Sequence, residues 1–347
     1  MSQGPTVVVA GVGRFGALHA RVWREAGARV VGLVDTDPGR LAEVAAAHRV
    51  AQTDRDLAAL LARQPADAVV VASDEASHAD LAVTALEAGS HAFVEKPLAL
   101  STVDAQRIAD TAAARGRQVV AGHISRFAAP MARMRARIAG GAVGTLCVLR
   151  LRRDFSRAWY ASFGDRVHPV WESCIHDIDL AISFTGRPVR RVVATRSAAA
   201  GEAAPSVVSA LLEFDGGVIA TIESAWLVPA GAPGTLDDGP LALDGAIVGE
   251  AEALGLGGVI KQRLVSDALV EWTGSGAQVP DLSLWPEEDG VVGGALRREV
   301  GYAVDVFTGR RAPDVMPLRE ACWGVATAEA IVSSLDTGDP VRVTAPA

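Results

Sequence analysis

The sequence has no long uninterrupted apolar run and very little cysteine. No stretch of its 347 residues approaches the length of a membrane-spanning segment. Its three cysteines, Cys147, Cys174 and Cys322, have neither disulfide nor metal-site spacing. The first expected strand begins within a few residues of Met1, which leaves no room for a signal peptide. These absences predict a soluble, cytoplasmic protein.

The charge balance argues against a nucleic-acid partner. Acidic residues outnumber basic ones by 41 to 33, and both signs are interspersed at a formal net charge of -8. A nucleic-acid-binding surface would be basic. Half of the residues are hydrophobic and 21% are charged, which is typical of a globular chain. At this length we expect two domains.

The sequence does contain a glycine pattern between a strand and a helix, in "TVVVAGVGRFGALHARVWREAG". Gly11 permits a tight turn, Gly13 lets a pyrophosphate approach the backbone, and Gly16 lets the helix pack closely on the strand. The pyrophosphate would lie on the free amides of the helix N-terminus. We therefore predict a dinucleotide site, with Arg14 and Phe15 as further cofactor-binding candidates.

A second expected strand, "RVVGLVD", ends at Asp35, 19 residues beyond Gly16. A carboxylate at that place accepts hydrogen bonds from the adenosine ribose, and it would repel a 2′-phosphate. Asp35 therefore favours NAD over NADP, although Arg40 is close enough in sequence to weaken the preference. The alternative is a glycine-rich turn followed by an ordinary aspartate at a strand end.

Strands and helices alternate through residues 1–124. We predict helices near Asp56–Arg63, Ala79–Ala88 and Thr102–Arg115, with strands in "ADAVVVAS", "HAFVEKP" and "QVVAGH" between and after them. Such alternation is typical of an α/β fold with a doubly wound parallel sheet, here a Rossmann dinucleotide-binding domain. Ligands of these sheets bind outside the carboxyl ends of the strands.

One of these strand ends carries two charges, in "FVEKPLALS". Charges are costly to bury without partners, so Glu95 and Lys96 mark either a solvated turn or a ligand site. We favour the ligand site and group four residues near the strand ends as cofactor-binding candidates. These are Ser73, His78, Glu95 and Pro97.

The glycine loop, "EKP" and "GHISRF" resemble the glucose–fructose oxidoreductase, inositol dehydrogenase and rhizopine-catabolism (Gfo/Idh/MocA) family. The resemblance continues through "WESCIHDID" to "LREACWGVATAEAIVSS" and so covers nearly the whole chain. It implies that Lys96 stands beside the nicotinamide and the substrate hydroxyl. It also implies that the bond between Lys96 and Pro97 is often cis.

The pattern changes from about Gly144. Long strands are expected in "TLCVLRLRRDF", "VRRVVATRS", "SVVSALLEF" and "GVIATIESAW", the last two joined by a hairpin turn at Asp215-Gly216-Gly217. We predict an α+β domain over 125–347 with an open, mostly antiparallel sheet. A C-terminal helix over about 318–335 is placed to pack back on the first domain. The resemblance implies that one sheet face forms a subunit interface, so we expect a homodimer or homotetramer.

The helix expected in "WESCIHDIDLAISFTGRP" carries a polar stripe and ends at Gly186, just before Pro188. At about 100° per residue, four side chains fall within an arc of roughly 60°. They are Glu172, His176, Asp179 and Ser183. Asp177 faces away from this arc, and we expect it to be solvated.

A histidine with carboxylates one turn on either side suits acid–base chemistry, because they orient the imidazole and raise its basicity. The resemblance implies that His176 is catalytic, although the family often has Asp where this chain has Glu172. The alternatives are a solvated helix face with supporting ion pairs and a metal site formed by Glu172, His176 and Asp179. No second histidine has helical ligand spacing and such family members use no metal, so we expect none.

We therefore expect an NAD(P)-dependent dehydrogenase that oxidises a secondary hydroxyl of a cyclic polyol, sugar or sugar derivative. His176 would take the hydroxyl proton, and Lys96 would stabilise the developing alkoxide. Glu172 and Asp179 would orient His176 or bind neighbouring hydroxyls. Further substrate-binding candidates are His123, Arg126, Arg152, Trp159 and Tyr160.

Two other functions stay open. One is an enzyme with a tightly bound cofactor that shuttles hydride between two sugars. The other is a catalytically silent nucleotide sensor, since a fold does not fix a function. A sensor would need neither Lys96 nor His176, which favours the enzyme.

The first prediction concerns the choice of cofactor. NAD should bind more tightly than NADP, and Asp35→Ser should narrow or invert the difference, because the substitution removes the charge that repels a 2′-phosphate. Titration of both dinucleotides against wild type and variant measures this. A wild-type preference for NADP would contradict the placement of Asp35 on the ribose.

Overall fold

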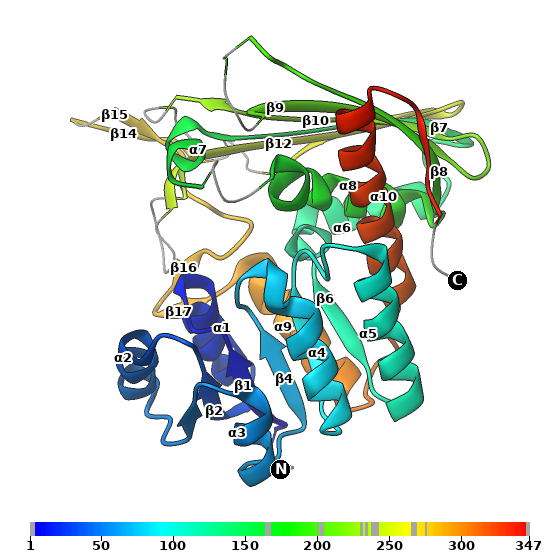
Figure 1. Cartoon of the computed structure of the whole chain (residues 1–347). Coiled ribbons are helices and arrows are strands. Elements are labelled where there is room, and N and C mark those ends of the chain that lie inside the picture. The colour runs from blue at the N-terminus through cyan, green and yellow to red at the C-terminus, as the bar shows by residue number, and fades with distance from the viewer. Residues whose placement is uncertain are drawn as a thin grey trace. The chain divides into compact units, whose positions relative to one another are not determined.

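The computed structural model describes residues 4–163, 168–199, 201, 205–229, 232, 235–236, 243–264, 269–274 and 276–344. The chain forms two compact units (Figure 1). The first comprises residues up to His123 together with Glu288–Cys322, and the second comprises Ile124–Glu287 and the residues from Trp323. The sequence-based division assigned 288–322 to the second domain, whereas in the structure this segment belongs to the first unit.

The first unit contains a six-stranded sheet in the order β3-β2-β1-β4-β5-β6. The strands are β1 (Thr6–Ala10), β2 (Arg29–Val34), β3 (Thr53–Asp54), β4 (Ala68–Val71), β5 (His91–Glu95) and β6 (Val119–Gly122). All neighbouring strands are parallel. The strand order reverses between β1 and β4, which is the position where doubly wound sheets bind ligands. The predicted Rossmann sheet is confirmed.

Helices connect these strands. They are α1 (Arg14–Glu25), α2 (Pro38–His48), α3 (Leu57–Arg63), the 3-10 turn η1 (Glu75–Ser77), α4 (His78–Glu87) and α5 (Thr102–Arg115). The carboxylates of Asp37 and Asp56 cap α2 and α3, and the hydroxyl of Ser101 caps α5, each by accepting backbone N–H groups. The caps at Asp56 and Ser101 explain why α3 and α5 start within one residue of their predicted positions. The third predicted helix, α4, begins at His78 without a side-chain cap, one residue before its predicted start.

The segment that returns to the first unit contains the strand β17 (Val291–Val292) and the helix α9 (Gly294–Phe307). Glu25 at the end of α1 holds it: its Oε2 accepts from the Val292 amide at 3.1 Å and lies 3.6 Å from Arg297 Nη1. The rings of Trp23 and Phe307 stack with centroids 6.2 Å apart. An apolar contact and a charged cluster therefore fix α9 on α1.

The second unit contains an eight-stranded sheet in the order β11-β12-β7-β10-β9-β8-β18, with β13 paired to β12. Its strands are β7 (Leu146–Ser156), β8 (Val189–Arg196), β9 (Val207–Phe214), β10 (Ile219–Val228), β11 (Thr235–Leu236), β12 (Leu243–Gly255), β13 (Gly258–Arg263) and β18 (Val341–Arg342). β7 and β10 run parallel and the other pairs antiparallel. The predicted mostly antiparallel sheet is confirmed, as is the hairpin at Asp215–Gly217 between β9 and β10.

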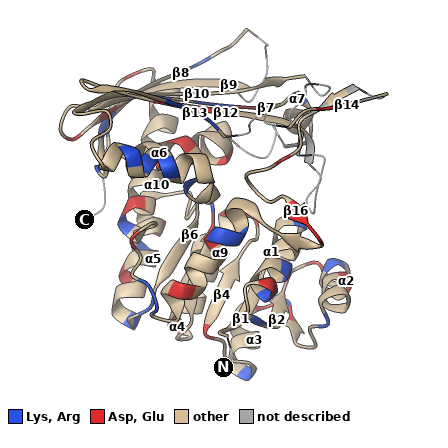
Figure 2. Ribbon diagram, turned by 180° about the vertical axis from the view of Figure 1, so that it is seen from behind, with Lys and Arg blue, Asp and Glu red and all other residues tan. Residues whose placement is uncertain are grey.

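The remaining elements are short strands and helices. They are η2 (Ile124–Phe127), α6 (Ala129–Ala139), α7 (Arg157–Phe163), the π-helical turn η3 (Val170–Cys174), α8 (Ile175–Thr185), β14 (Glu271–Thr273), β15 (Gly276–Gln278), β16 (Glu287–Glu288) and α10 (Leu318–Thr337). Charges of both signs are spread over both units (Figure 2). In the part of the chain that is described, no helix is long and apolar enough to span a membrane.

Buried and exposed residues alternate along β9 and β10, so one face of this sheet is covered and the other is open. Ile219 and Leu227 of β10 lie on the open face. The homo-oligomer expected through this face stays a prediction.

Asp67, which directly precedes β4, binds Thr6 at the start of β1 and so joins the starts of these two neighbouring strands. Its Oδ2 accepts from the backbone N and the hydroxyl of Thr6, both at 2.7 Å, and the Asp67 amide donates to Thr6 Oγ1 at 2.9 Å. These hydrogen bonds lower the pKa of the Asp67 carboxyl. A lowered folded pKa means that the charged form stabilises the fold above the unfolded pKa of about 3.9, and that this stability is lost as the pH falls further.

We predict that Asp67→Asn lowers the free energy of unfolding at neutral pH by about 1 kcal/mol, a value that allows for solvent screening of this exposed group. The difference from wild type should shrink below about pH 4, where the native carboxyl is being protonated. Chemical denaturation at several pH values measures both effects. Asp110→Asn, on the exposed surface of α5, is the control; equal losses in the two variants would contradict the role of Asp67.

Candidate active site

The glycine loop between β1 and α1 is shaped by the chain's own backbone at two positions. Gly11 has a φ of +85°, and a Cβ there would lie 2.5 Å from the backbone of Ser73. A Cβ on Gly16 would overlap the carbonyl oxygen of Gly11. A Cβ on Gly13, by contrast, would meet no described atom within 4 Å. Gly11 and Gly16 therefore allow the loop to form, and Gly13 borders open space.

The N-terminus of α1 fits a dinucleotide. Gly13 is its N-cap and supplies no side-chain hydrogen bond, and no acidic residue lies in the first turn. Gly13 and Arg14 are exposed and Phe15 is half-buried. Amides at the start of a helix have no intrahelical partner and attract anions. The residues present can thus hold the pyrophosphate of a dinucleotide.

Asp35 and Arg40 both bind the backbone of Val12 in the glycine loop. Asp35 Oδ2 accepts from the Val12 amide at 2.7 Å, and Arg40 Nε donates to the Val12 carbonyl at 3.0 Å. Arg40 Nη1 also pairs with Glu43 Oε2 at 2.9 Å. Both residues lie at the loop as expected, and both help to shape it. A substitution of Asp35 therefore also removes a support of the loop.

His78 joins two of the expected site segments. Its Nδ1 lies 2.7 Å from the carbonyl oxygen of Pro97, and its Nε2 lies 3.2 Å from that of Ser73. The side chain is buried. Ser73 uses its hydroxyl to contact that of Ser77 at 2.6 Å. Sequence reasoning listed His78 with the cofactor contacts, whereas here its ring holds two backbone segments together.

The end of β5 is not a solvated turn. Glu95 is buried, and its Oε1 lies 2.8 Å from Nε2 of His19, a fully buried residue of α1. Its Oε2 accepts from the Lys96 amide at 3.2 Å. Lys96 is half-buried, and the peptide bond to Pro97 is cis. Sequence reasoning missed His19, although a histidine on the apolar face of an amphipathic helix needs a polar partner.

The helix α8 of the second unit begins after a π-helical turn. Glu172 lies in this turn and His176 lies in α8 proper. Hydrogen bonds of a π-turn join residues five apart, which widens the turn. The α-helical arithmetic that put Glu172 on one arc with His176 therefore does not hold across the junction. Glu172 is half-buried and His176 is buried.

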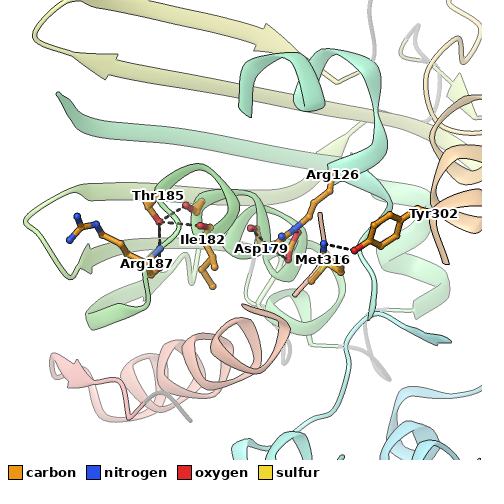
Figure 3. A network of polar contacts seen from close by, with 8 residues as sticks. Arg126, Asp179, Ile182, Thr185, Arg187, Tyr302 and Met316 are labelled. Atoms are coloured by element: carbon orange, nitrogen blue, oxygen red, sulfur yellow. Dashed lines mark hydrogen bonds and ion pairs between the residues drawn. The ribbon is translucent and has the colours of Figure 1, made fainter. Parts of the chain in front are cut away.

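Asp179 and Arg126 form a bidentate buried pair. Asp179 Oδ2 accepts from Arg126 Nε at 2.8 Å, and Oδ1 accepts from Nη2 at 2.7 Å (Figure 3). Both side chains are about 1% exposed. The pair anchors α8 to the η2 turn. The predicted roles of Asp179, in orienting His176 or binding a hydroxyl, and of Arg126, in contacting substrate, stay predictions.

The expectation that Asp177 is solvated is wrong. Asp177 is 2% exposed, and its Oδ1 accepts from Arg153 Nη2 at 2.7 Å. Burial raises the pKa of the Asp177 carboxyl in spite of this guanidinium. The helix α8 packs on β7, which carries Arg153, and the Asp177 side chain therefore has no access to solvent.

The other substrate-binding candidates lie in different surroundings. Arg152 precedes Arg153 on β7 and so faces the opposite, open side of the sheet, where it pairs with Glu250 at 3.3 Å. Trp159 is buried against Phe155. Tyr160 is half-buried, and the Arg157 guanidinium lies 4.5 Å from its ring centre. His123, the residue directly after β6, is buried.

Two of the three cysteines are unsuited to thiol chemistry, and the described residues show no metal cluster. Burial raises the pKa of the Cys174 and Cys322 thiols to about 12, which leaves them protonated at neutral pH. Among the ranges that the structure covers, no three His, Cys, Asp or Glu side chains are grouped to hold a metal ion.

The fold and the site together define a class of protein, an oxidoreductase with a Rossmann domain. Residues 6–123 match the family described as an oxidoreductase family with an NAD-binding Rossmann fold, and residues 131–250 match the GFO/IDH/MocA C-terminal domain. The chain therefore belongs to the Gfo/Idh/MocA oxidoreductase family. The first match confirms the expected family for the dinucleotide-binding domain, and the second match confirms it for the C-terminal domain.

Several named relatives are similar to this chain. Inositol 2-dehydrogenase 1 of Saccharopolyspora erythraea is 32% identical over 62% of this chain and 66% of its own length. D-apiose dehydrogenase of Paraburkholderia graminis is 28% identical over 62% of this chain and 59% of its own length. The chain thus spans somewhat less than two thirds of these curated relatives.

Solved structures share the fold. GenD2 from gentamicin A biosynthesis, in complex with NAD, superposes with a TM-score of 0.80 at 24% identity, covering 99% of this chain and 98% of that chain. Scyllo-inositol dehydrogenase from Lactobacillus casei, with bound NAD(H) and scyllo-inositol, gives a TM-score of 0.80 at 17% identity, over 98% and 99% of the chains. At these identities the likeness concerns the fold.

We predict that Arg153→Met lowers the free energy of unfolding by about 3–5 kcal/mol, because it leaves the Asp177 carboxylate buried without its partner. The double substitution Arg153→Met/Asp177→Leu should recover most of the loss, since no buried charge remains. Denaturant unfolding measures both. The matched control is Arg107→Met, which breaks an exposed pair with Asp80 and should cost under about 1 kcal/mol. A loss at Arg153 no greater than the control's would refute the prediction.

Proposed function

We propose that this protein is an NAD-dependent dehydrogenase that oxidises a secondary hydroxyl of a cyclic polyol, a sugar or a sugar derivative. The observation that carries the proposal is the uncapped N-terminus of α1 at the open Gly13. This helix follows β1 of the same sheet in which β5 ends at Glu95, directly before Lys96 and Pro97. The names of the relatives, which include inositol 2-dehydrogenases and D-apiose dehydrogenase, support the substrate class.

NAD is the proposed cofactor. Asp35 donates no proton and each of its carboxylate oxygens has a second lone pair, so it can accept from ribose hydroxyls while it holds Val12. The Arg40 guanidinium is shared between the Val12 carbonyl and Glu43, which reduces its attraction for a 2′-phosphate. These two features together favour NAD over NADP.

Lys96 and His176 are the proposed catalytic residues. NAD, when bound, accepts the hydride that leaves the substrate carbon. His176 takes the proton of the hydroxyl on that carbon, because imidazole titrates near neutral pH. Lys96 stabilises the negative charge that develops on the hydroxyl oxygen. Glu172 binds a neighbouring hydroxyl or supports His176.

Asp179 has a different proposed role. Because Asp179 is fully buried and forms a bidentate pair with the buried Arg126, we assign the pair to holding α8 in place. The direction of His176 then depends on an anchor three residues further along the same helix. Asp179 is thus a positioning residue rather than a group that touches substrate.

A catalytically silent nucleotide sensor is the alternative, and turnover distinguishes the two. Purified protein is offered NAD with a panel of inositols, hexoses, aminosugars and glycosides, and formation of reduced nicotinamide is followed by its near-ultraviolet absorbance. The proposal expects turnover with at least one of them. Tight NAD binding without turnover across the whole panel, in both directions, would favour the sensor.

We predict that His176→Ala and Lys96→Ala each lower kcat by about a hundredfold or more while NAD affinity changes little, because each group acts on the reacting oxygen. Lys96→Arg should restore little, since a planar guanidinium does not replace a compact ammonium. Steady-state kinetics and NAD titration give the two quantities separately. Trp272→Ala, at an exposed residue of β14, is the control. Full turnover in either alanine variant would remove that residue from the mechanism.

A further inference from the structure

His19 of α1 has no assigned role in the chemistry, yet it is completely buried. It lies three residues after Gly16, with the Phe15 ring edge-on at 5.1 Å and the Phe93 ring tilted at 5.2 Å between centroids. Its Nε2 lies 2.8 Å from Glu95 Oε1. An ionised carboxylate only accepts, so Nε2 is the donor. Its Nδ1 has no hydrogen-bond partner among the described residues, so the polar function of this ring is directed at Glu95.

The carboxylate of Glu95 fits into a space that the neighbouring strand leaves for it. Glu95 pairs in register with Gly122 of β6. A Cβ at position 122 would lie 2.8 Å from Glu95 Oε1 and 2.9 Å from Cδ. The absence of a side chain at Gly122 therefore makes room for the carboxylate beside His19. Burial of a carboxylate is costly unless it is hydrogen-bonded, and the His19 imidazole and the Lys96 amide supply those bonds.

The following turn is held from a second helix. His78, the first residue of α4, places its Nδ1 2.7 Å from the carbonyl oxygen of Pro97. The backbone of Lys96 is thus fixed on one side through Glu95 and α1, and on the other through Pro97 and α4. Among these contacts, only the one from His19 reaches Glu95 from a residue distant in sequence and donates to its carboxylate.

We propose that His19 is a positioning residue: by binding Glu95 it fixes the strand end that carries Lys96, and with it the position of the Lys96 side chain. The consequence for turnover rests on the proposed function of Lys96. The consequence for the state of Lys96 does not, since it concerns this chain's own residues in the absence of cofactor or substrate.

The sequence offers an unusually clean probe, because Lys96 and Lys261 are its only two lysines. Lys261 lies on β13 of the other unit, 2.7 Å from Glu252, and is 70% exposed. An amine-reactive reagent is applied to the protein without NAD, and acylation of each lysine is followed by peptide mass spectrometry. The ratio of the two rate constants reports on Lys96, with Lys261 as the internal reference.

His19→Leu should change the labelling rate of Lys96 relative to that of Lys261 by about threefold or more, because the strand end that carries Lys96 is no longer held through the contact between Glu95 and His19. His19→Gln keeps an N–H donor at nearly the same reach, so its labelling ratio should lie within about twofold of the wild-type ratio. Val22→Ala, at another fully buried side chain of α1, should lower stability and leave the ratio unchanged.

Gly122→Ala provides a second route, since its Cβ displaces the Glu95 carboxylate from His19 without altering either side chain. It should change the ratio in the same direction as His19→Leu. If His19→Leu folds and its ratio of Lys96 to Lys261 labelling equals that of wild type, the proposal is overturned, whatever the substrate of the enzyme. If His19→Leu does not fold, an unchanged ratio in Gly122→Ala overturns it instead. Where turnover is found, His19→Leu should lower kcat by about tenfold, and His19→Gln should recover it. A changed ratio without any turnover in wild type would instead contradict the proposed function alone.

Discussion

The buried carboxylate of Glu95 links several elements of the first unit. A carboxylate away from water needs donors, and here they come from α1, through His19, and from the backbone of Lys96. The strand β6 must leave space for it, which Gly122 does. The helix α1, the strands β5 and β6 and the segment with Lys96 are thus linked through one charged group. The same interaction that satisfies the charge also fixes the direction of the residue beside it.

The same rule organises the second unit. Asp177 and Asp179 both lie on α8, and each is matched by an arginine from another element, Arg153 of β7 and Arg126 of η2. Buried ion pairs give little net stability, because desolvation offsets the attraction. They do require one specific arrangement, since a shift would leave a charge unpaired. These two pairs, one and three residues after His176, together with the preceding π-turn, fix the orientation of α8.

Much of the fold could be predicted because its signals are local. The strand and glycine pattern at Thr6–Gly16, the caps at Asp56 and Ser101, and the glycines of the β9–β10 hairpin each act within a few residues of chain. Alternation of strands and helices then limits the topology, since crossover connections favour parallel pairing. The candidate site was found for the same reason: Asp35 and Glu95-Lys96-Pro97 end strands of a sheet whose ligand edge is known in advance.

The sequence by itself determined the dinucleotide loop, the strand ends that border it, and the helix that carries His176. Only the tertiary structure decided the partners of the buried charges: His19 for Glu95, Arg153 for Asp177 and Arg126 for Asp179. It also returned residues 288–322 to the first unit. The physical reason is that a buried charge selects a partner by its position in space. Glu95 and His19 are 76 residues apart in the chain, and no local periodicity or cap records such a pairing.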